Sequence, residues 1–224
     1  MVRDEVWEAV EKTDLPSDAK VITTTWACKK KANGTLRGRV VARGFQQVPH
    51  QHYDPTAVAA PVANDTTIRI ALVLMLLGGW AAHIVDVKGA FLKGKFENGE
   101  KIYMKIPEGM EKHYSSTSVL MLKKTLYGLK QAAMQFWRLL LEIMKKMGHE
   151  RSKVDPCMYY SRRENGDMTI ILSWVDDNII MGPDNVVNEE RIKIGKLIDI
   201  DDVGPLNKFV GCKVEIDQIT KTAN

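Results

Sequence analysis

The sequence predicts an α+β fold, in which a sheet that is not fully parallel is covered on one face by helices. Short apolar runs typical of strands alternate with longer segments whose apolar residues recur at helical spacing. Turn signals at Asn33-Gly34 and near Gly211 are typical of hairpins, which join antiparallel strands. The chain has 224 residues, 45% of them hydrophobic, which is enough to bury one or two cores.

The first predicted element is a hairpin that carries most of a basic cluster. Trp26–Lys31 and Leu36–Arg43 flank Asn33-Gly34, the dipeptide that most readily supplies two successive positive φ angles. No acidic side chain occurs between Lys20 and Tyr53. The basic residues in this interval are Lys20, Lys29, Lys30, Lys31, Arg37, Arg39 and Arg43. They would attract a phosphate backbone or a nucleoside triphosphate, although the same charges are compatible with an ordinary solvated face.

Three segments are predicted to be helices. Asn64-Asp65 and Gly78-Gly79 bracket the apolar stretch Thr66–Leu77, which we predict to be a buried helix. Gln131–Met147 has apolar residues at helical spacing and is the strongest helix prediction in the chain. A polar, charged helix is predicted over Val187–Ile198.

Three further apolar runs are predicted to be strands, and acidic residues lie in or between them. His83–Phe91 contains Asp86 among apolar neighbours. Thr169–Val175 and Asn178–Met181 would form a second hairpin, with Asp176-Asp177 at its turn. A last short hairpin is predicted about Gly211.

These three aspartates are candidates for a metal site. An ionised aspartate in an apolar strand costs several kcal/mol unless a cation or hydrogen-bond donors offset its desolvation. Two adjacent carboxylates also repel each other. If the strands are neighbours, Asp86 and Asp176 can converge as the hard oxygen ligands that magnesium prefers, and two such ions would support nucleotidyl transfer. Taken alone, Asp176-Asp177 fits a polar hairpin turn better than a metal site, and Asp86 would then be a lone exception.

Composition argues against other classes of protein. Three widely spaced cysteines fit neither a disulfide framework nor a CxxC metal site, and His50 and His52 lack the further ligands of a structural zinc site. The longest apolar run, Ile70–Leu77, is too short to cross a bilayer, and the N-terminus lacks the pattern of a signal peptide. We therefore expect an intracellular, cytoplasmic protein with no membrane partner.

An ordered set of motifs spanning about residues 26 to 216 resembles one known family. The motifs are Val85-Asp86-Val87-Lys88-Gly89-Ala90-Phe91-Leu92, Ile102-Tyr103-Met104, Pro107-Glu108-Gly109, Lys124-Thr125-Leu126-Tyr127-Gly128-Leu129-Lys130-Gln131-Ala132, Arg151-Ser152-Lys153-Val154-Asp155-Pro156-Cys157, Trp174-Val175-Asp176-Asp177, Val203-Gly204-Pro205-Leu206 and Phe209-Val210-Gly211. Together they resemble the reverse transcriptase of copia-type LTR retrotransposon Pol polyproteins. The sequence departs from the family's usual pattern at Trp174, commonly tyrosine, and at Ala132-Ala133-Met134, commonly Ala-Pro-Arg.

The resemblance implies the fingers-and-palm core of a right-hand polymerase, with an antiparallel palm sheet backed by helices and the thumb missing. Residues 1–62 and 94–131 would form the fingers. Residues 63–93 would form the first part of the palm, and residues 132–224 the rest of the palm with the primer-grip hairpin.

The resemblance also implies roles for individual residues. Asp86, Asp176 and Asp177 would be the catalytic aspartates that bind two magnesium ions, for which manganese would be a substitute. Phe91 would lie under the sugar of the incoming nucleotide and exclude a 2′-hydroxyl, although a core aromatic residue would fit the same position. Arg39, with Arg43 as a neighbour, would contact the triphosphate. Tyr127 and Gly128 would line the nucleotide pocket. The primer grip would consist of Phe209, Val210 and Gly211.

The function implied is RNA-directed DNA polymerase activity: template-directed addition of deoxynucleotides to a primer 3′ end. Its partners would be an RNA or DNA template with primer, deoxynucleoside triphosphates, and further Pol regions such as RNase H and integrase. The location would be particle-associated if the element is active. The alternative is an inactive, truncated remnant that at most binds nucleic acid. A palm-fold nucleotide cyclase would share the sheet, but its Gly-Gly-Asp-Glu-Phe type hairpin is missing from the sequence.

Overall fold

The computed structural model describes residues 5–30, 33–97, 99–217 and 219–223. Lys31, the last residue of the first predicted strand, lies outside the described residues. The chain divides into two compact units, and each unit combines two separate segments. Unit 1 consists of Met1–Ala60 and Phe91–Arg138, and unit 2 of Pro61–Ala90 and Leu139–Asn224.

Unit 1 contains a small sheet with the strand order β1-β7-β6-β2 and a separate two-stranded hairpin of β3 and β4. In the sheet, β2 and β6 run parallel and the other neighbours run antiparallel. The strands are β1 (Trp7–Glu11), β2 (Val21–Ile22), β3 (Thr24–Lys30), β4 (Leu36–Ala42), β6 (Tyr103–Met104) and β7 (Ser118–Leu122).

The β3–β4 hairpin confirms the first predicted element but not its tight turn. Lys30 pairs with Leu36, so five residues separate the strands rather than two. Of the dipeptide Asn33-Gly34, only Gly34 has a positive φ angle, +83°. The Asn33-Gly34 dipeptide therefore does not form the two-residue turn that the sequence predicted.

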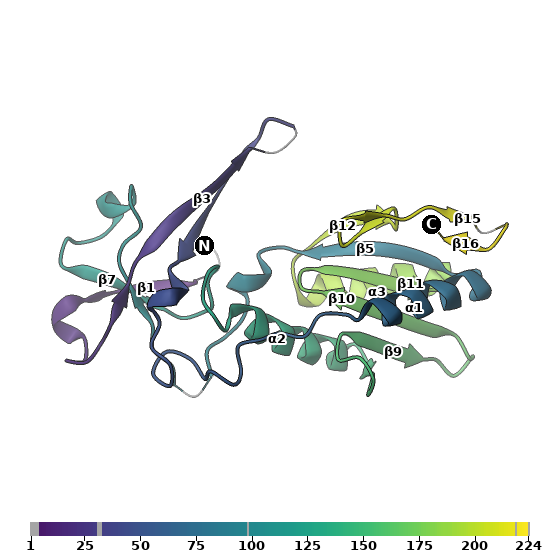
Figure 1. Cartoon of the computed structure of the whole chain (residues 1–224), viewed down its shortest axis with the longest axis horizontal. Coiled ribbons are helices and arrows are strands. Elements are labelled where there is room, and N and C mark those ends of the chain that lie inside the picture. Colours follow the sequence, from purple (N-terminus) through teal and green to yellow (C-terminus); the bar gives the residue numbers. More distant parts are fainter. Residues whose placement is uncertain (1–4, 31–32, 98, 218, 224) are drawn as a thin grey trace. The chain divides into compact units, whose positions relative to one another are not determined.

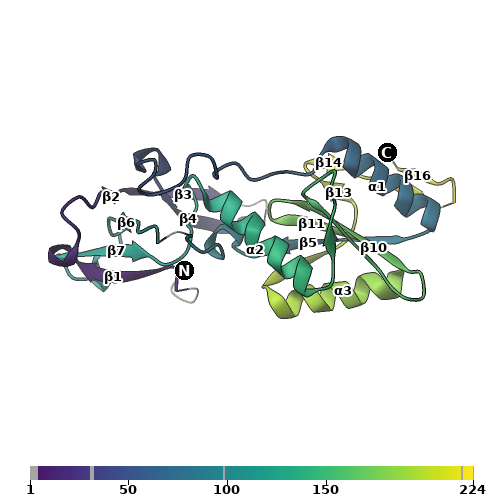
Figure 2. The same ribbon diagram turned by 90° about the horizontal axis from the view of Figure 1, so that it is seen from below.

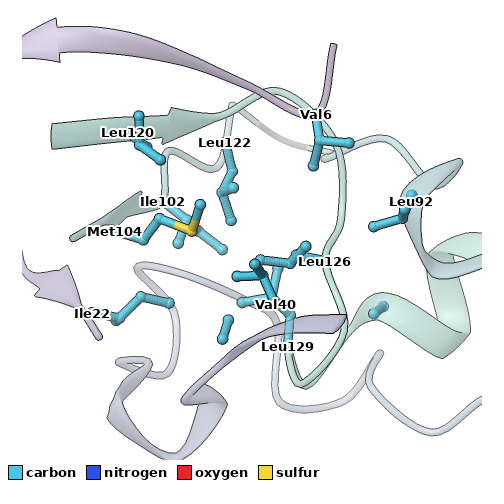
Figure 3. Packing of buried hydrophobic residues seen from close by; sticks show 12 residues of the cluster. Val6, Ile22, Val40, Leu92, Ile102, Met104, Leu120, Leu122, Leu126 and Leu129 are labelled. Atoms are coloured by element: carbon cyan, nitrogen blue, oxygen red, sulfur yellow. The ribbon is translucent and has the colours of Figure 1, made fainter. Parts of the chain in front are cut away.

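Aliphatic side chains from several strands and loops of unit 1 form its core (Figure 3). Val6, Ile102, Leu120 and Leu122 come from the sheet region, and Val40 comes from the hairpin. The remaining members are Ile22, Ala42, Leu92, Met104, Leu126, Leu129 and Ala132. The hairpin strand β4 is therefore held by apolar burial in addition to its hydrogen bonds to β3.

Unit 2 is built around a sheet with the strand order β12-β5-β11-β10-β9-β8, in which every neighbouring pair is antiparallel (Figure 1). Two small hairpins, β13–β14 and β15–β16, follow it. The strands are β5 (Ala81–Val87), β8 (Glu150–Arg151), β9 (Met158–Arg162), β10 (Met168–Trp174), β11 (Asp177–Gly182), β12 (Ile200–Pro205), β13 (Lys208–Phe209), β14 (Cys212–Lys213), β15 (Ile216–Asp217) and β16 (Thr222–Ala223).

The α-helices in the described part of the chain are α1 (Asp65–Gly78), α2 (Ala132–Lys146) and α3 (Asp184–Leu197), close to the predicted ranges. At the start of α1, the Asn64 side chain accepts a hydrogen bond from the Thr66 N–H (2.9 Å), and Gly79 ends the helix with φ +62°. Helix α2 continues from the unit 1 segment into the unit 2 segment. None of these helices is long and apolar enough to span a lipid bilayer.

Helix α1 is not the fully buried helix that the sequence predicted. Ala71, Met75 and Leu76 are buried, but Ile70 is 54% and Leu77 is 66% exposed. Because α1 is apolar on most of its circumference, its sequence pattern did not show which side faces the core.

Helices lie on both faces of the unit 2 sheet, so the prediction of a sheet covered on one face is wrong. Ile84, Leu172 and Ile179 share a cluster with Met75 of α1. Strand alternation turns the intervening side chains to the other face, and Figure 2 shows α3 on the side of these strands opposite to α1. The predicted strand His83–Phe91 also ends early, at Val87, and a short 3-10 turn over Ala90–Leu92 follows it.

Candidate active site

Three aspartates of unit 2 oppose one another across neighbouring strands. Asp177 on β11 pairs with Asp86 on β5, and Asp201 on β12 pairs with Asp86 from the other side. Directly opposed residues of an antiparallel pair point to the same face, with Cβ atoms about 4.5–5.5 Å apart. Asp86 and Asp177 are half-buried, whereas Asp201 is exposed. We call this set the carboxylate row.

The predicted acidic hairpin turn lies beside this row. Trp174 pairs with Asp177, which leaves Val175 and Asp176 as a two-residue turn. Val175 has φ +56°, an uncommon and strained conformation for a β-branched residue. The turn is held by the Asp176 carbonyl, which accepts hydrogen bonds from the Val87 N–H (2.9 Å) and the Asn178 side-chain amide (3.0 Å). Asp176 is thereby fixed next to the row, with its side chain exposed.

The burial and close spacing of the acidic residues shift pKa values in and beside the carboxylate row. Burial raises the pKa of Asp177, and the neighbouring charge of Asp176 raises it further. The Lys88 ammonium forms an ion pair with Asp201 at 2.7 Å. The hydrogen bond to Asp201 raises the pKa of Lys88, and the charges of Asp199 and Asp86 add smaller increases.

The donor set suits a hard divalent cation. Across the described ranges, no three histidine, cysteine or acidic side chains already converge as a metal centre. Magnesium, however, is usually bound through only one or two carboxylates and completes its shell with water and substrate phosphates. Asp86 and Asp177, opposed on one face with Asp176 in the adjoining turn, fit that description.

In unit 1 the structure brings together the residues predicted to bind the nucleotide. The rings of Phe91 and Tyr127 meet edge to face, with centroids 5.3 Å apart. The Arg39 guanidinium carbon lies 5.0 Å from the centroid of the Tyr127 ring. Arg39 Nε is buried and has no hydrogen-bond partner among the described residues, so this group retains donor capacity.

Gly128, the remaining residue predicted for the nucleotide pocket, lies in close contact with strand β4, which the sequence did not predict. A Cβ atom at this position would lie 2.1 Å from the Ala42 carbonyl oxygen and 2.6 Å from a Val41 methyl group. The Ala42 N–H also donates to the Tyr127 carbonyl at 2.8 Å. The glycine therefore allows the Tyr127-Gly128 backbone to lie against β4, next to the strand position of Arg39.

The predicted primer-grip residues form the turn between β13 and β14. Val210 and Gly211 have φ angles of +49° and +82°, as a type I′ turn requires. Phe209 is buried in the unit 2 core, while the two turn residues are exposed. Phe209 and Trp174 line the same cavity of about 420 Å³, which places this hairpin near the acidic turn.

Sequence reasoning missed three residues of the site: Val175, Asn178 and Asp201. Of the three, Asn178 could most readily have been predicted from the sequence, because an amide side chain within an apolar strand is as unusual as the aspartate of β5. The strain at Val175 and the position of Asp201 depend on the turn and on the pairing register, which the sequence pattern does not specify.

An antiparallel sheet with helices on both faces, carrying opposed carboxylates beside a tight turn, defines an α+β domain with a candidate divalent-metal site. The family model described as reverse transcriptase (RNA-dependent DNA polymerase) matches residues 4–224, and the chain belongs to this family. The resemblance that the motifs indicated is thereby confirmed.

Curated relatives support the copia-type assignment. The chain is 33% identical over 207 residues to the retrovirus-related Pol polyprotein from transposon TNT 1-94 of Nicotiana tabacum, covering 90% of this chain and 15% of that protein. It is 28% identical over 220 residues to the corresponding polyprotein from transposon RE1 of Arabidopsis thaliana, covering 96% of this chain and 14% of that protein. The chain therefore spans about one seventh of the length of these relatives.

A solved foamy viral protease-reverse transcriptase in complex with double-stranded DNA is a distant structural neighbour. The TM-score is 0.42 at 10% sequence identity, covering 90% of this chain and 28% of that one.

Proposed function

We propose that this chain is the catalytic core of an RNA-directed DNA polymerase, with unit 2 as the palm and unit 1 as the fingers. The observation that carries the proposal is the direct pairing of Asp86 with Asp177, with Asp176 in the adjoining turn. Two opposed carboxylates on one face repel each other unless a cation lies between them. Family membership supports the choice of polymerase chemistry over other uses of such a site.

In this proposal Asp86, Asp176 and Asp177 hold two magnesium ions, with manganese as a substitute. When bound, the ions would lower the barrier to attack by a primer 3′-hydroxyl and stabilise the leaving pyrophosphate. The protein's part is to keep the carboxylates in place. The β5–β11 hydrogen bonds fix Asp86 and Asp177, and the bonds to the Asp176 carbonyl fix the turn.

The group in unit 1 would receive the deoxynucleoside triphosphate. The Arg39 guanidinium offers paired donors to phosphate oxygens, and its contact with the Tyr127 ring would orient it. The edge-to-face contact with Tyr127 would limit the freedom of the Phe91 ring, as exclusion of a 2′-hydroxyl would require. In this proposal, the exposed turn at Val210-Gly211 meets the primer backbone.

The wider partners of the chain are also part of the proposal. The relatives are Pol polyproteins of which this chain matches a small part, so further Pol regions such as RNase H and integrase would accompany it. The rest of the substrate would be an RNA or DNA template with its primer, in the cytoplasm or within a particle.

Primer extension on poly-rA/oligo-dT with magnesium tests the polymerase proposal. We expect the wild-type chain to incorporate deoxythymidine and Asp176→Asn to lose roughly 100-fold or more of this activity. Glu164→Gln, an exposed acid in the β9–β10 turn, is the matched control and should retain activity. Equal incorporation by wild type and Asp176→Asn, or none by either, would contradict the proposal. The second outcome would favour an inactive remnant that at most binds nucleic acid.

A further inference from the structure

The loop that joins β8 to β9, residues 152–157, is held by a buried aspartate. Asp155 is only 3% exposed, and its two carboxylate oxygens accept hydrogen bonds from two backbone N–H groups. One donor is the Cys157 N–H (2.8 Å), two residues later in the same loop. The other is the N–H of Asn64 (2.8 Å), the cap residue of α1. A single side chain therefore connects the start of α1 to the segment that leads into β9.

The same connection continues towards the acidic turn. The Cys157 carbonyl accepts a hydrogen bond from the Ser173 N–H (2.9 Å), which extends the β9–β10 ladder towards the end of β10. Ser173 is buried and pairs with Asn178, whose side-chain amide donates to the Asp176 carbonyl. The position of Ser173 is one residue before the pair that closes the turn. The hydrogen bonds of Asp155 thus lead, through one peptide unit, to the base of the turn.

Helix α1 provides a fixed point for this connection. Its buried residues include Met75, which shares a cluster with Leu172 of β10, so the helix and the strand are already packed together. The connection through Asp155 adds a second attachment, between the start of α1 and the end of β10. Two attachments limit the movement of the end of β10 more than one does.

We propose that Asp155 is a positioning residue for the acidic turn, which ties the end of β10 to the start of α1 so that Asp176 stays beside the carboxylate row. This inference rests on the proposed metal-dependent function. Asp155 touches neither the metal nor the substrate, and it acts through the backbone alone. A misplacement of about 1 Å, caused far from the reacting atoms, can lower a rate roughly 100-fold.

Asp155→Asn tests the connection, because asparagine has nearly the same shape but only one acceptor oxygen for the two N–H groups. We expect the Mg²⁺ concentration for half-maximal primer extension to rise roughly tenfold, as when residues that support metal ligands are changed. Incorporation should recover at high Mg²⁺. A smaller folded fraction would instead lower incorporation at all Mg²⁺ concentrations alike.

Ser152→Ala is the matched control in the same loop. The Ser152 hydroxyl oxygen accepts hydrogen bonds from the N–H groups of Val154 (3.1 Å) and Asp155 (3.3 Å). Its removal loosens the loop but leaves the connection from Asn64 to Cys157 in place. We expect the Mg²⁺ requirement of this variant to equal that of the wild type.

Amide hydrogen exchange in EDTA measures the connection without metal or activity. In Asp155→Asn, we expect the Ser173 amide to exchange roughly tenfold faster, and the Ile198 amide at the end of α3 to be unchanged. If Asp155→Asn does not fold, Asp155→Ser replaces it. A serine hydroxyl can still accept the Cys157 N–H, as in an ST-turn, but is too short to reach Asn64 as well. Both measurements should then change in the same direction.

Two results would overturn the inference. One is a Ser173 amide that exchanges at the wild-type rate in the Asp155 variant. The other is a Mg²⁺ requirement that stays unchanged, or that rises equally in Ser152→Ala, because the loop would then have only a structural role. A wild-type protein that extends no primer would instead contradict the proposed polymerase function. The exchange rates would still show whether Asp155 holds the end of β10.

Discussion

At the residue scale, the site is organised around Asp177, a half-buried carboxylate that the fold places beside other acidic residues. Asp86 and Asp177 are held opposite each other by the backbone ladder, and Asp177 is partly desolvated. The raised pKa of Asp177 means that its ionised form is less favourable in the folded protein than in the unfolded chain. A cation bound at the proposed site would offset this cost.

Asp177→Asn should therefore stabilise the metal-free protein at neutral pH while weakening its response to metal. Because Asp177 is only half-buried, solvent screens its interactions, and we expect a gain below about 1 kcal/mol in the free energy of unfolding. Thermal melts in EDTA and in Mg²⁺ would measure both effects, with Glu164→Gln as the control.

The pH dependence gives a second check on Asp177. Its folded pKa lies above the ordinary value of 3.8, so wild type gains stability relative to Asp177→Asn as the pH falls from neutral through the folded pKa towards 3.8. A constant stability difference between the two proteins over that window would count against the raised pKa.

The sequence predicted part of this site for a clear physical reason. Asp86 and the pair Asp176-Asp177 attract notice because carboxylates are rare in apolar strands. Asp201 lies in a stretch of charged residues, where one more aspartate is unremarkable. Only the β5–β12 register distinguishes it from Asp202, and register is a property of the folded sheet.

At the element scale, the docking of the β3–β4 hairpin depends on close backbone packing at two glycines, Gly128 and Gly44. Gly128 lies against β4, where the backbones of the two segments are in direct contact. Gly44, two residues after the end of β4, is similarly confined, because its Cβ would lie 2.1 Å from the Gly128 carbonyl oxygen. The hairpin that carries Arg39 is thus joined to the Tyr127 segment by close backbone packing.

Gly128→Ala should destabilise unit 1 strongly, by about 3 kcal/mol or more, because the new methyl group meets a backbone carbonyl that cannot easily move. Gly34→Ala is the matched control: it has a similar φ angle, +83°, but open space around it, and should cost about 1 kcal/mol. Urea denaturation followed by tryptophan fluorescence would compare the two. Equal losses would show that backbone strain alone, and not packing, constrains Gly128.

Helix and strand positions were predicted well where local chemistry determines them. The Asn64 cap and Gly79 end define α1, and the turn signal about Gly211 correctly located the β13–β14 hairpin. That hairpin is not the last, however, because β15–β16 follows it and was not predicted. The exposed side of α1 and the five-residue loop after β3 were missed, because both depend on what packs nearby.

At the scale of the whole molecule, exposed basic residues are concentrated on the β3–β4 hairpin. The net charge is only +4, yet Lys29, Lys30 and Arg37 are exposed on the β3–β4 hairpin, in an interval without acidic residues. Such a concentration would matter most for a polyanion that contacts several of these side chains together.

We expect the triple change of Lys29, Lys30 and Arg37 to Gln to weaken primer-template binding and to flatten its salt dependence. Each lost phosphate contact should reduce the slope of log K against log salt by about 0.9. Changing Lys145, Lys146 and Lys196 to Gln alters the net charge equally and is the control. Fluorescence anisotropy at several salt concentrations would measure both. Identical slopes for the two variants would mean that the hairpin is merely a solvated face.

The family was recognisable from the order of motifs along the chain, whereas the construction of the units was not visible in composition or periodicity. Each unit is assembled from two segments that are separated in sequence. The names fingers and palm, and the boundaries predicted for them, remain predictions.

The carboxylate row has a consequence for how copies of such a gene decay. Insertion of one codon between Ala81 and Val85 would preserve every acidic residue and almost every motif. It would, however, shift the two-residue period of β5, so that Asp86 would turn towards the side of α3 or drop out of register with Asp177. Under the proposed function, a copy that retains all its motifs would then be inactive, and the spacing within β5 would be a stricter sign of an intact gene than the presence of its aspartates.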